Sequence, residues 1–566
     1  MQISMATALQ FVRAYQAETS LTIAELWAFP TMLRLACMEL LVTAFTRLAP
    51  TVKPPFAASA CIAMLEQFDD TECVSRALRN FIAITSISWK DFFDRTSRVE
   101  AILQEDPAGI YPRMDFNTRD RYRKAVEDLS DGAFSPEPVV AEYIVARARA
   151  ANPADQDGHI GVWLVGGRRR ETEAALGYHP PWKARMRRWL SRRGGWLYAG
   201  AMSGTGMTTL LAPALYLWIE HARPLAWTVG IVLALLPASI LATAVVNWLV
   251  TLTVPPRVLP KLDFEKEIPM DCAAAVVMPV IVGTPAEAAA SVERLEMHWM
   301  ANPDPMLRFA LLTDHLDAQA ESMAGDTEIE QAFVGGVRRL NQLHGQDGHG
   351  PFHLLHRPRR FNPSEACWMG WERKRGKLEQ FNHLVLGRDA SAFLIQEGDT
   401  GALYGLKFAV TVDADTSLPP GTVNRLVGSL AHPLNKAEFD AETGRVKSGY
   451  TVIQPRVEIR PESGTRSLFA RLCTGDTAID IYSQATSDVY QDLFGSGTYV
   501  GKGIYEIGPF ESSLAGRVPE NALLSHDLFE RAHGRAALAS DIVVYEGFPA
   551  GYPEYSRRWQ RWVRGN

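Results

Sequence analysis

The hydrophobic and polar positions divide the chain into three stretches of different character. In the first, residues 1–182, apolar residues recur at helical spacing and charged residues occupy the positions between them. The run 26–41 shows this pattern, and its charges at Arg34 and Glu39 favour a packed amphipathic helix over one that crosses a bilayer. We therefore predict that residues 1–182 form an all-helical accessory domain.

The second stretch, residues 183–260, contains two long uncharged segments. No charged residue occurs in 194–219 or in 224–256, and each segment exceeds the roughly 20 apolar residues that a membrane-spanning helix needs. Because the connection is short, the pattern predicts an antiparallel transmembrane hairpin with helices at about 195–219 and 225–254. Basic residues flank both outer ends, which places them in the cytoplasm by the positive-inside rule. Two buried helices of a soluble protein are the alternative interpretation.

In the third stretch, residues 261–566, strand patterns alternate with helical patterns. Apolar, β-branched runs predict buried strands at 273–283, 307–314, 352–356 and 408–412. Strands that alternate with helices indicate a mainly parallel sheet with right-handed crossovers. We therefore predict an α/β domain over residues 261–566.

Acidic residues stand at the ends of two of these predicted strands. Asp314 ends one strand. Asp413 and Asp415 follow another strand, and Pro419 and Pro420 prevent that strand from continuing. Because open α/β sheets bind ligands at the carboxyl ends of their strands, we expect these acids to gather at a binding edge. Carboxylates are the hard oxygen ligands that Mg²⁺ or Mn²⁺ prefers, usually with phosphate oxygens completing the shell. The pattern predicts a metal-bridged nucleotide-diphosphate site.

Three further segments each allow two interpretations. The basic run 371–377, which ends at Lys377 before a helical stretch, suits a diphosphate or forms a solvated basic loop. Asp527 begins a predicted helix, where its carboxylate either stabilises the helix dipole or acts as a general base. Alternating Arg and Trp residues near the end of the chain suit a sugar diphosphate or a helix at a membrane surface. The candidates in that segment are Arg558, Arg561 and Trp562.

Composition and motif spacing argue against several other functions. The net charge of −6 gives no reason to expect a nucleic acid as partner. The six cysteines include no C-x-x-C pair, which favours reduced, buried thiols over a zinc site or a disulfide framework. The segment 497–503 fails as a P-loop because its glycines are too close and Gly503 stands where Ser or Thr would bind Mg²⁺. No secretory signal, H-E-x-x-H or G-x-S-x-G motif is present.

The order of these motifs resembles the membrane-embedded glycosyltransferases with a GT-A fold. Those enzymes have a strand-end acid, a D-x-D motif, an acid that opens a helix and a final Arg-Trp motif. The corresponding residues here are Asp314, Asp413 and Asp415, Asp527, and Arg558-x-x-Arg561-Trp562. Arg558 replaces the Gln of the cellulose-synthase-like enzymes, and this form is similar to the cyclic β-1,2-glucan synthases, of the family 84 type. The runs D-A-D-T-S-L-P, G-K-L-E-Q-F-N and S-H-D-L-F-E, and N-terminal runs at 25–35 and 111–116, fit the same family.

The resemblance implies a role for each of these residues. Asp314 would hold the uridine, and Asp413 and Asp415 would bind UDP-glucose and a divalent cation, Mg²⁺ or Mn²⁺, with Asp415 on the metal. Asp527 would take the proton of the acceptor 2-hydroxyl. Further contacts to the nucleotide, the diphosphate and the acceptor would come from Lys377, Arg558, Arg561 and Trp562.

The resemblance also implies an activity and a location. We expect an inverting transfer of glucose from UDP-glucose to a growing β-1,2-glucan that begins on the protein itself, in the bacterial inner membrane, with the catalytic domain facing the cytoplasm. Family members are longer and carry more membrane helices and a phosphorylase-like domain, so we expect a fragment truncated at the C-terminal end of its GT-A domain. The alternatives are a processive synthase of another β-glycan and a catalytically silent membrane scaffold that binds a nucleotide sugar.

Overall fold

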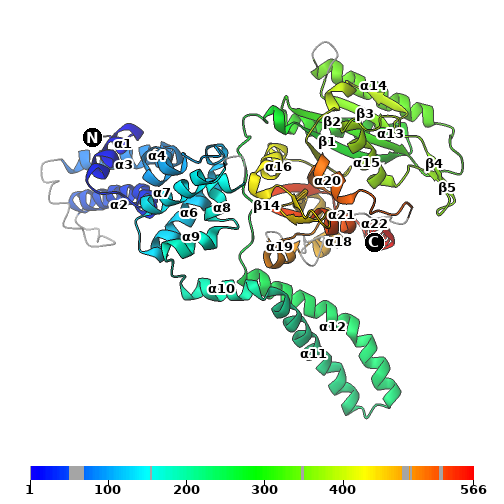
Figure 1. Ribbon diagram of the computed structural model, residues 1–566, viewed down its shortest axis with the longest axis horizontal. Helices are drawn as coiled ribbons and strands as arrows, with labels where there is room; N and C mark the ends of the chain where they lie inside the picture. The colour runs from blue at the N-terminus through cyan, green and yellow to red at the C-terminus, as the bar shows by residue number, and fades with distance from the viewer. Residues whose placement is uncertain are drawn as a thin grey trace. The chain divides into compact units, whose positions relative to one another are not determined.

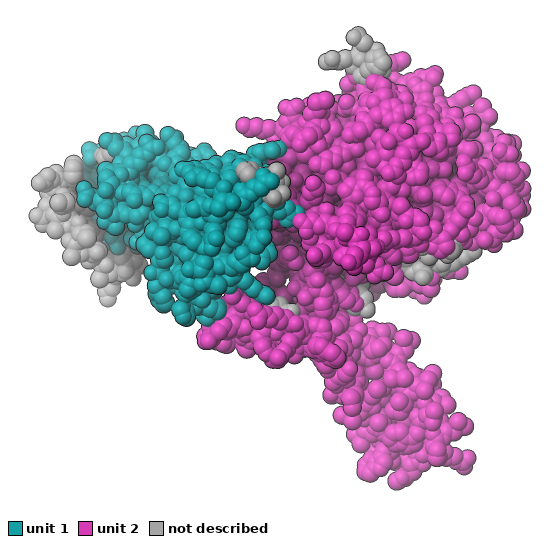
Figure 2. Space-filling view, viewed as in Figure 1, with its two compact units in different colours: residues 1–181 teal, residues 182–566 magenta. Residues whose placement is uncertain are grey.

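The chain divides into two compact units, residues 1–181 and 182–566 (Figure 2). The computed structural model describes residues 2–49, 69–152, 156–345, 350–474, 483–484, 487–521 and 527–565. All candidate site residues named above belong to the second unit.

The regular elements described in the first unit are all helical, in line with the helical periodicity. The nine α-helices are α1 (Met5–Glu18), α2 (Ile23–Leu48), α3 (Asp70–Ser86), α4 (Trp89–Thr96), α5 (Arg98–Leu103), α6 (Phe116–Ala133), α7 (Glu137–Ala150), α8 (Ile160–Leu164) and α9 (Arg169–Leu176), counted over the described residues. A capping box formed by Thr22 and Glu25 fixes the start of α2. Trp27 of α2 stacks on Phe93 of α4 with ring centroids 4.8 Å apart, so the first half of α2 packs into the unit.

The length of α2 corrects one expectation. The helix continues past 26–41 as far as Leu48, and it is long and apolar enough to cross a membrane. Among the described residues only α2 and α12 (Pro224–Thr253) meet this criterion of length and composition. The charges at Arg34 and Glu39 therefore do not make α2 too short or too polar for a span.

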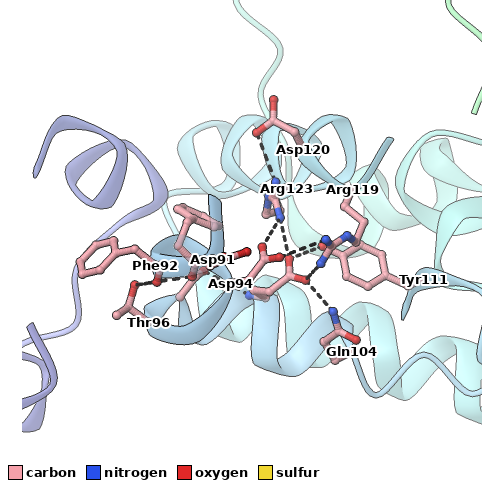
Figure 3. Close-up of polar contacts among 12 residues, drawn as sticks. Asp91, Phe92, Asp94, Thr96, Gln104, Tyr111, Arg119, Asp120 and Arg123 are labelled. Carbon is pink, nitrogen blue, oxygen red and sulfur yellow. Dashed lines mark hydrogen bonds and ion pairs between the residues drawn. The ribbon is translucent and has the colours of Figure 1, made fainter. Parts of the chain in front are cut away.

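A buried ionic network joins α4, α5 and α6 of the first unit (Figure 3). Glu100, with only 1% of its surface exposed, accepts a hydrogen bond from the Tyr111 hydroxyl at 2.6 Å. Arg119 and Arg123 donate to the same carboxylate at 2.7 and 2.8 Å. The guanidinium of Arg123 lies 4.8 Å from the ring centroid of Phe116, which contributes a cation–π contact. These contacts hold α5 and α6 together.

Two long helices lie side by side at the start of the second unit (Figure 1). After α10 (Trp182–Arg192) come α11 (Gly194–Ile219) and α12, within one residue of the helices expected at 195–219 and 225–254. Much of their apolar surface is exposed, including Leu211 on α11 and Leu233 and Leu236 on α12. The two helices differ in composition, because α11 is rich in glycine and threonine and only α12 meets the membrane criterion.

An eight-stranded sheet forms the core of the second unit. Its strands are β1 (Ala274–Val282), β2 (Leu307–His315), β3 (Phe352–His356), β6 (Ile395–Glu397), β7 (Phe408–Thr411), β10 (Val452–Ile459), β13 (Gly503–Glu506) and β14 (Ala536–Glu546), in the order β14-β10-β13-β7-β1-β2-β3-β6. β1, β2, β3 and β7 run parallel, and so do β10 and β14. β13 is antiparallel to both of its neighbours, and β6 is antiparallel to β3.

The sheet is therefore mixed, but six of its eight strands run in the same direction, so the prediction of a mainly parallel sheet is confirmed. The two opposing strands, β6 and β13, were not predicted. β6 and β13 are too short to show a periodicity, with three and four residues. β10 contains Pro455 and charged residues that break its apolar pattern. The four strands that the sequence predicts, β1, β2, β3 and β7, are present within about two residues of their expected bounds.

Helices cover both faces of the parallel strands. α15 (Arg373–Val385) packs on one face, where Leu378 and Phe381 share a hydrophobic cluster with Ala310 and Leu312 of β2. α13 (Pro285–Ala301) and α14 (Asp326–His344) pack against each other, and they contact β2 and β3, respectively. Because successive strand residues point to opposite faces, Asp314 lies on the α15 face and His315 on the α14 face.

The described cysteines form no disulfide. Cys37, Cys73 and Cys272 are buried, as expected, whereas Cys367 is partly exposed and Cys473 is exposed. Cys61 lies outside the described residues. The expectation of free thiols is confirmed for these five, and the expectation of burial is wrong for two of them.

Candidate active site

Three carboxylates converge at the carboxyl ends of β7 and β14. Asp413 and Asp415 follow β7, and Glu546 is the last residue of β14. One oxygen from each lies within 4.8 Å of the others. The two strands are not neighbours in the sheet, but Ser417 pairs with Tyr545 through backbone hydrogen bonds of 2.7 and 3.0 Å. This bridge carries the loop after β7 across to the end of β14.

Two lysines neutralise the inner part of this carboxylate cluster. Lys374 of α15 donates to Asp413 Oδ1 at 2.6 Å. Lys502, just before β13, lies 3.2 Å from Asp413 Oδ2 and also pairs with Glu546. Burial acts to raise the pKa of Asp413, but the charges of Lys374 and Lys502 outweigh it and lower the pKa to about 2. Asp413 is therefore an anion at any physiological pH.

Arg558 closes the outer part of the cluster. It lies in α22 (Tyr552–Gly565), which follows β14. Its guanidinium is 3.3 Å from Glu546 Oε2 and 3.7 Å from Asp415 Oδ2. Asp415 keeps 46% of its side chain exposed, so the cluster opens to solvent on this side.

The cluster has the donor set of a site for a hard divalent cation. Three carboxylates offer oxygen ligands that suit Mg²⁺ or Mn²⁺, and the exposed side at Asp415 leaves room for phosphate oxygens. In ligand type and in access, Asp413 and Asp415 fit the metal expected from the sequence, and Glu546 offers a third carboxylate.

Asp314 and Lys377 lie in a buried ionic cluster at the end of β2. Arg357 donates two parallel hydrogen bonds to the Asp314 carboxylate, at 2.8 and 2.7 Å, and Lys377 Nζ lies 3.1 Å from Asp314 Oδ2. Burial lowers the pKa of Lys377 to about 8, although the charge of Asp314 acts to raise it. Gly370 lies directly against this cluster, because a Cβ there would stand 2.2 Å from Asp314 Oδ2.

A single helix connects the two acidic clusters. α15 directs Lys377 to Asp314 and Lys374, one turn earlier, to Asp413. The structure thus confirms that the acids after β2 and β7 gather at one edge, since both strands flank β1 in parallel register. The two acids have different environments, because Asp314 is 2% exposed whereas the side chain of Asp415 is 46% exposed.

A cavity of about 480 Å³ lies at the carboxyl ends of β1 and β2. Its lining includes Val282 at the end of β1, Gly283 after it, Leu316 and Asp317 after β2, and Arg359. Apolar side chains with a few charged groups are typical of small-molecule sites. Asp314, Arg357 and Lys377 do not line the cavity. Asp317 of the lining pairs with Arg373 at 2.8 Å, and the Arg373 carbonyl accepts a hydrogen bond from Arg357, so these contacts link the cavity to the buried ionic cluster.

Asp527 is the first residue of α21 (Asp527–Gly534) and lies against the 501–502 loop. A Cβ at Gly501 would stand 2.6 Å from Asp527 Oδ1, so the loop backbone passes directly over this carboxylate. The carbonyl of Gly501 accepts a hydrogen bond from Lys374 at 2.6 Å. Lys374 therefore links Asp413 to the loop that contacts Asp527. Residues 522–526 lie outside the described residues.

The last motif is described only in part. Arg558 belongs to the carboxylate cluster, as given above. Arg561 and Trp562 lie in α22, but their side chains are outside the described part of the structure.

Sequence reasoning missed Glu546, Lys374, Lys502 and Arg357. Glu546 carries the same signal as Asp314, an acid at the end of an apolar strand, because V-V-Y-E closes β14. Lys374 lies in the basic run that drew attention to Lys377. Lys502 lies in segment 497–503, which was considered only as a P-loop, so its lysine was overlooked.

Comparison with known proteins gives the family. No protein-family model matches the chain. Over 502 residues the chain is 35% identical to the cyclic β-(1,2)-glucan synthase NdvB of Rhizobium meliloti (strain 1021). The alignment covers 87% of this chain and 18% of that enzyme, so the chain spans about a fifth of the length of its relative.

The fold and the site define an α/β protein with a carboxylate and lysine cluster at the carboxyl ends of its strands. By sequence the chain belongs to the cyclic β-1,2-glucan synthase family.

Proposed function

We propose that the chain is the GT-A glycosyltransferase region of a membrane enzyme that transfers glucose from UDP-glucose to a growing β-1,2-glucan. The observation that carries this proposal is the convergence of Asp413, Asp415 and Glu546, with Lys374 and Lys502 beside them. This arrangement supports binding of a diphosphate through a divalent cation. The similarity to a cyclic β-(1,2)-glucan synthase supports the choice of sugar and linkage.

In this proposal Asp413, Asp415 and Glu546 hold Mg²⁺ or Mn²⁺, which when bound supplies positive charge to the departing UDP. Lys502 and Arg558 lie beside the same carboxylates and orient the diphosphate. The bidentate Asp314–Arg357 pair and the neighbouring cavity accommodate the uridine, with Lys377 holding Asp314 in place.

Asp527 is the proposed general base. It accepts the proton of the acceptor 2-hydroxyl, whose oxygen forms a bond to the anomeric carbon of glucose while the bond from that carbon to UDP breaks. Attack from the side opposite UDP converts an α-linked donor into a β-glucoside. The contact of Asp527 with Gly501, whose carbonyl binds Lys374, supports a position next to the donor.

The membrane part of the proposal has separate support. α2 and α12 are long and apolar enough to cross a bilayer, and α11 lies beside α12. Basic residues flank the 183–260 region at both ends, which favours a cytoplasmic active site in the inner membrane. UDP-glucose is made in the cytosol, so this orientation gives the site access to its donor.

Glucose incorporation from UDP-[¹⁴C]glucose tests the proposal. Membranes carrying the protein with Asp415→Asn or Asp527→Asn should incorporate less glucose than wild type by a factor on the order of 10³, since each change removes several kcal/mol of transition-state stabilisation. Glu442→Gln, in the exposed 440–445 turn, is the matched control and should keep wild-type activity. Linkage analysis of the product should give β-1,2 bonds.

The other outcomes separate the alternatives. Another linkage would identify a synthase of a different β-glycan. Cation-dependent binding of UDP-glucose without incorporation would favour a membrane scaffold. Wild-type turnover in Asp527→Asn would overturn the assignment of the base.

A further inference from the structure

A second group of metal-ligating side chains lies on the α14 face of the sheet. His315 ends β2, His356 ends β3, and Glu330 comes from α14. One ligand atom from each lies within 4.8 Å of the others. His356 is paired in the sheet with Thr313, so His315 lies two residues further along the neighbouring strand, on the same face as Thr313.

The distances in this group are close to those of a metal site. Glu330 Oε1 lies 3.2 Å from His315 Nε2 and 3.8 Å from His356 Nε2. In tetrahedral Zn²⁺ sites, metal–ligand bonds of about 2.0–2.1 Å place ligand atoms about 3.3 Å apart. The two distances from Glu330 are therefore within about half an ångström of this spacing, and the two histidine nitrogens lie within 4.8 Å of each other.

His356 is prepared to bind through Nε2. Its side chain is 1% exposed, and Nδ1 lies 2.8 Å from the Thr313 hydroxyl, which fixes the ring. Nε2 is buried without a hydrogen-bond partner, and it is directed toward Glu330. An unpaired buried nitrogen of this kind normally destabilises a protein.

The remaining nitrogen of His315 makes no hydrogen bond to the described residues but faces a carboxylate. Nδ1 lies 3.6 Å from Asp326 Oδ1. Asp326 is in turn held by Arg359 through contacts of 2.6 and 3.1 Å. Metal-bound histidines commonly direct their second nitrogen toward a carboxylate or another acceptor, which sets the ring orientation. Thr313 and Asp326 occupy these outer positions.

We propose that His315, His356 and Glu330 bind a divalent transition metal of the Zn²⁺ class. Two imidazoles and one carboxylate favour such an ion over Mg²⁺, which prefers oxygen ligands alone. His315 follows Asp314, and His356 precedes Arg357. The metal ties the ends of β2 and β3 to α14 and thereby positions the Asp314–Arg357 pair on the opposite face. This site is separate from the carboxylate cluster and does not depend on the proposed transferase activity.

Co²⁺ binding to the purified full chain tests the proposal, because tetrahedral Co²⁺ with nitrogen ligands absorbs strongly in the visible range. Excess Mg²⁺ occupies the carboxylate cluster during the titration. Wild type should bind one equivalent of Co²⁺ with a tetrahedral spectrum that added Zn²⁺ removes. Asp415→Asn should give the same spectrum, which shows that the carboxylate cluster does not contribute.

Variants locate the ligands. His356→Gln and Glu330→Gln should each weaken Co²⁺ binding by at least about tenfold, the range that loss of even an outer-shell partner produces. His353→Gln is the matched control, because His353 is a buried histidine on the opposite face of β3 with both ring nitrogens unpaired. It should bind Co²⁺ like wild type.

Glu330→Gln keeps the test valid if His356→Gln fails to fold, since Glu330 is partly exposed. The midpoint of unfolding of the metal-free Glu330→Gln variant, compared with that of wild type, shows whether the variant is folded. No tetrahedral Co²⁺ spectrum in wild type would overturn the proposal, as would undiminished Co²⁺ affinity in Glu330→Gln.

Discussion

The Glu100 network of the first unit and the Asp413–Asp415–Glu546 cluster of the second use the same kinds of side chain for different ends. Around Glu100, the carboxylate accepts hydrogen bonds from Tyr111, Arg119 and Arg123 (Figure 3). The ring of Phe116 makes a cation–π contact with Arg123. Burial acts to raise the pKa of Glu100, but the hydrogen bond from Tyr111 and the charge of Arg123 hold it below its ordinary value.

The second cluster differs in access and in geometry. Its carboxylates come from the ends of two strands that are not neighbours in the sheet, and Asp415 remains 46% exposed. The comparison teaches that charge and burial alone do not identify a functional site. Convergence of acids from two strand ends, with one side open, is the feature of the proposed ligand site that the Glu100 network lacks.

The largest expected effect concerns the closed network. Glu100→Gln leaves Arg123, which is fully buried, without its main countercharge. The free energy of unfolding of the first unit should fall by about 3–5 kcal/mol. Urea unfolding followed by circular dichroism measures it. Glu105→Gln, which breaks an exposed pair with Arg149, is the control and should change stability by less than about 1 kcal/mol. Equal effects of the two changes would remove the distinction between the network and an ordinary surface pair.

The next effect concerns the backbone at the open cluster. Gly501→Ala places a Cβ 2.6 Å from Asp527 Oδ1, so the carboxylate must move. Turnover should fall about 10²-fold, because misplacement of a catalytic group by about 1 Å has an effect of this size. Gly516→Ala is the control, since it has a similar positive φ but no atom within 4 Å of its added Cβ. Wild-type turnover in Gly501→Ala would show that catalysis does not depend on the position of Asp527 against the 501–502 loop.

A smaller effect should appear in the pH dependence of stability. The folded-state pKa of Lys377 is lowered to about 8, from an ordinary value of 10.5. Between these values the unfolded chain binds more protons at this residue, so its contribution to the free energy of unfolding rises with pH. The difference in stability between wild type and Lys377→Met should therefore shift in favour of wild type from about pH 8 to pH 10.

Lys374→Met gives the contrasting result on the same helix. The pKa of Lys374 is raised, because the charges of Asp413 and Asp527 outweigh the lowering effect of burial. Its difference from wild type should stay constant over the same pH interval. A flat profile for both variants would contradict the assigned environment of Lys377.

The smallest expected effect is on the stability of the open cluster. Asp415→Asn removes a half-exposed carboxylate whose nearest cation, Arg558, is 3.7 Å away. The free energy of unfolding should change by less than about 1 kcal/mol, although turnover should be lost. Destabilisation comparable to that of Glu100→Gln would mean that Asp415 is structural.

Much of the second unit could be predicted from local sequence. Apolar runs identified β1, β2, β3 and β7, because strands buried on both faces are continuously hydrophobic. The acids at the ends of β2 and β7 followed from the same runs. Short or interrupted strands such as β10 and β13 carry no comparable pattern, so the mixed topology was not predicted.

The candidate site could be predicted only in part, for a related reason. Glu546 reaches Asp415 through the Ser417–Tyr545 bridge, a pairing between distant segments that no local pattern encodes. Lys374 and Lys377 are one helical turn apart in the same basic run, but one pairs with Asp413 and the other with Asp314. The two lysines reach different acids because β7 and β2 lie on either side of β1 in the sheet.

Mn²⁺ affinity in the presence of saturating UDP tests the shared site of Asp413, Asp415 and Glu546 most directly. Electron paramagnetic resonance titration measures it for wild type, Glu546→Gln and the control Glu442→Gln. Wild type and Glu442→Gln should bind Mn²⁺ equally, and Glu546→Gln should bind it at least about tenfold more weakly, because a carboxylate ligand is lost. Wild-type Mn²⁺ affinity in a correctly folded Glu546→Gln variant would contradict the three-carboxylate site.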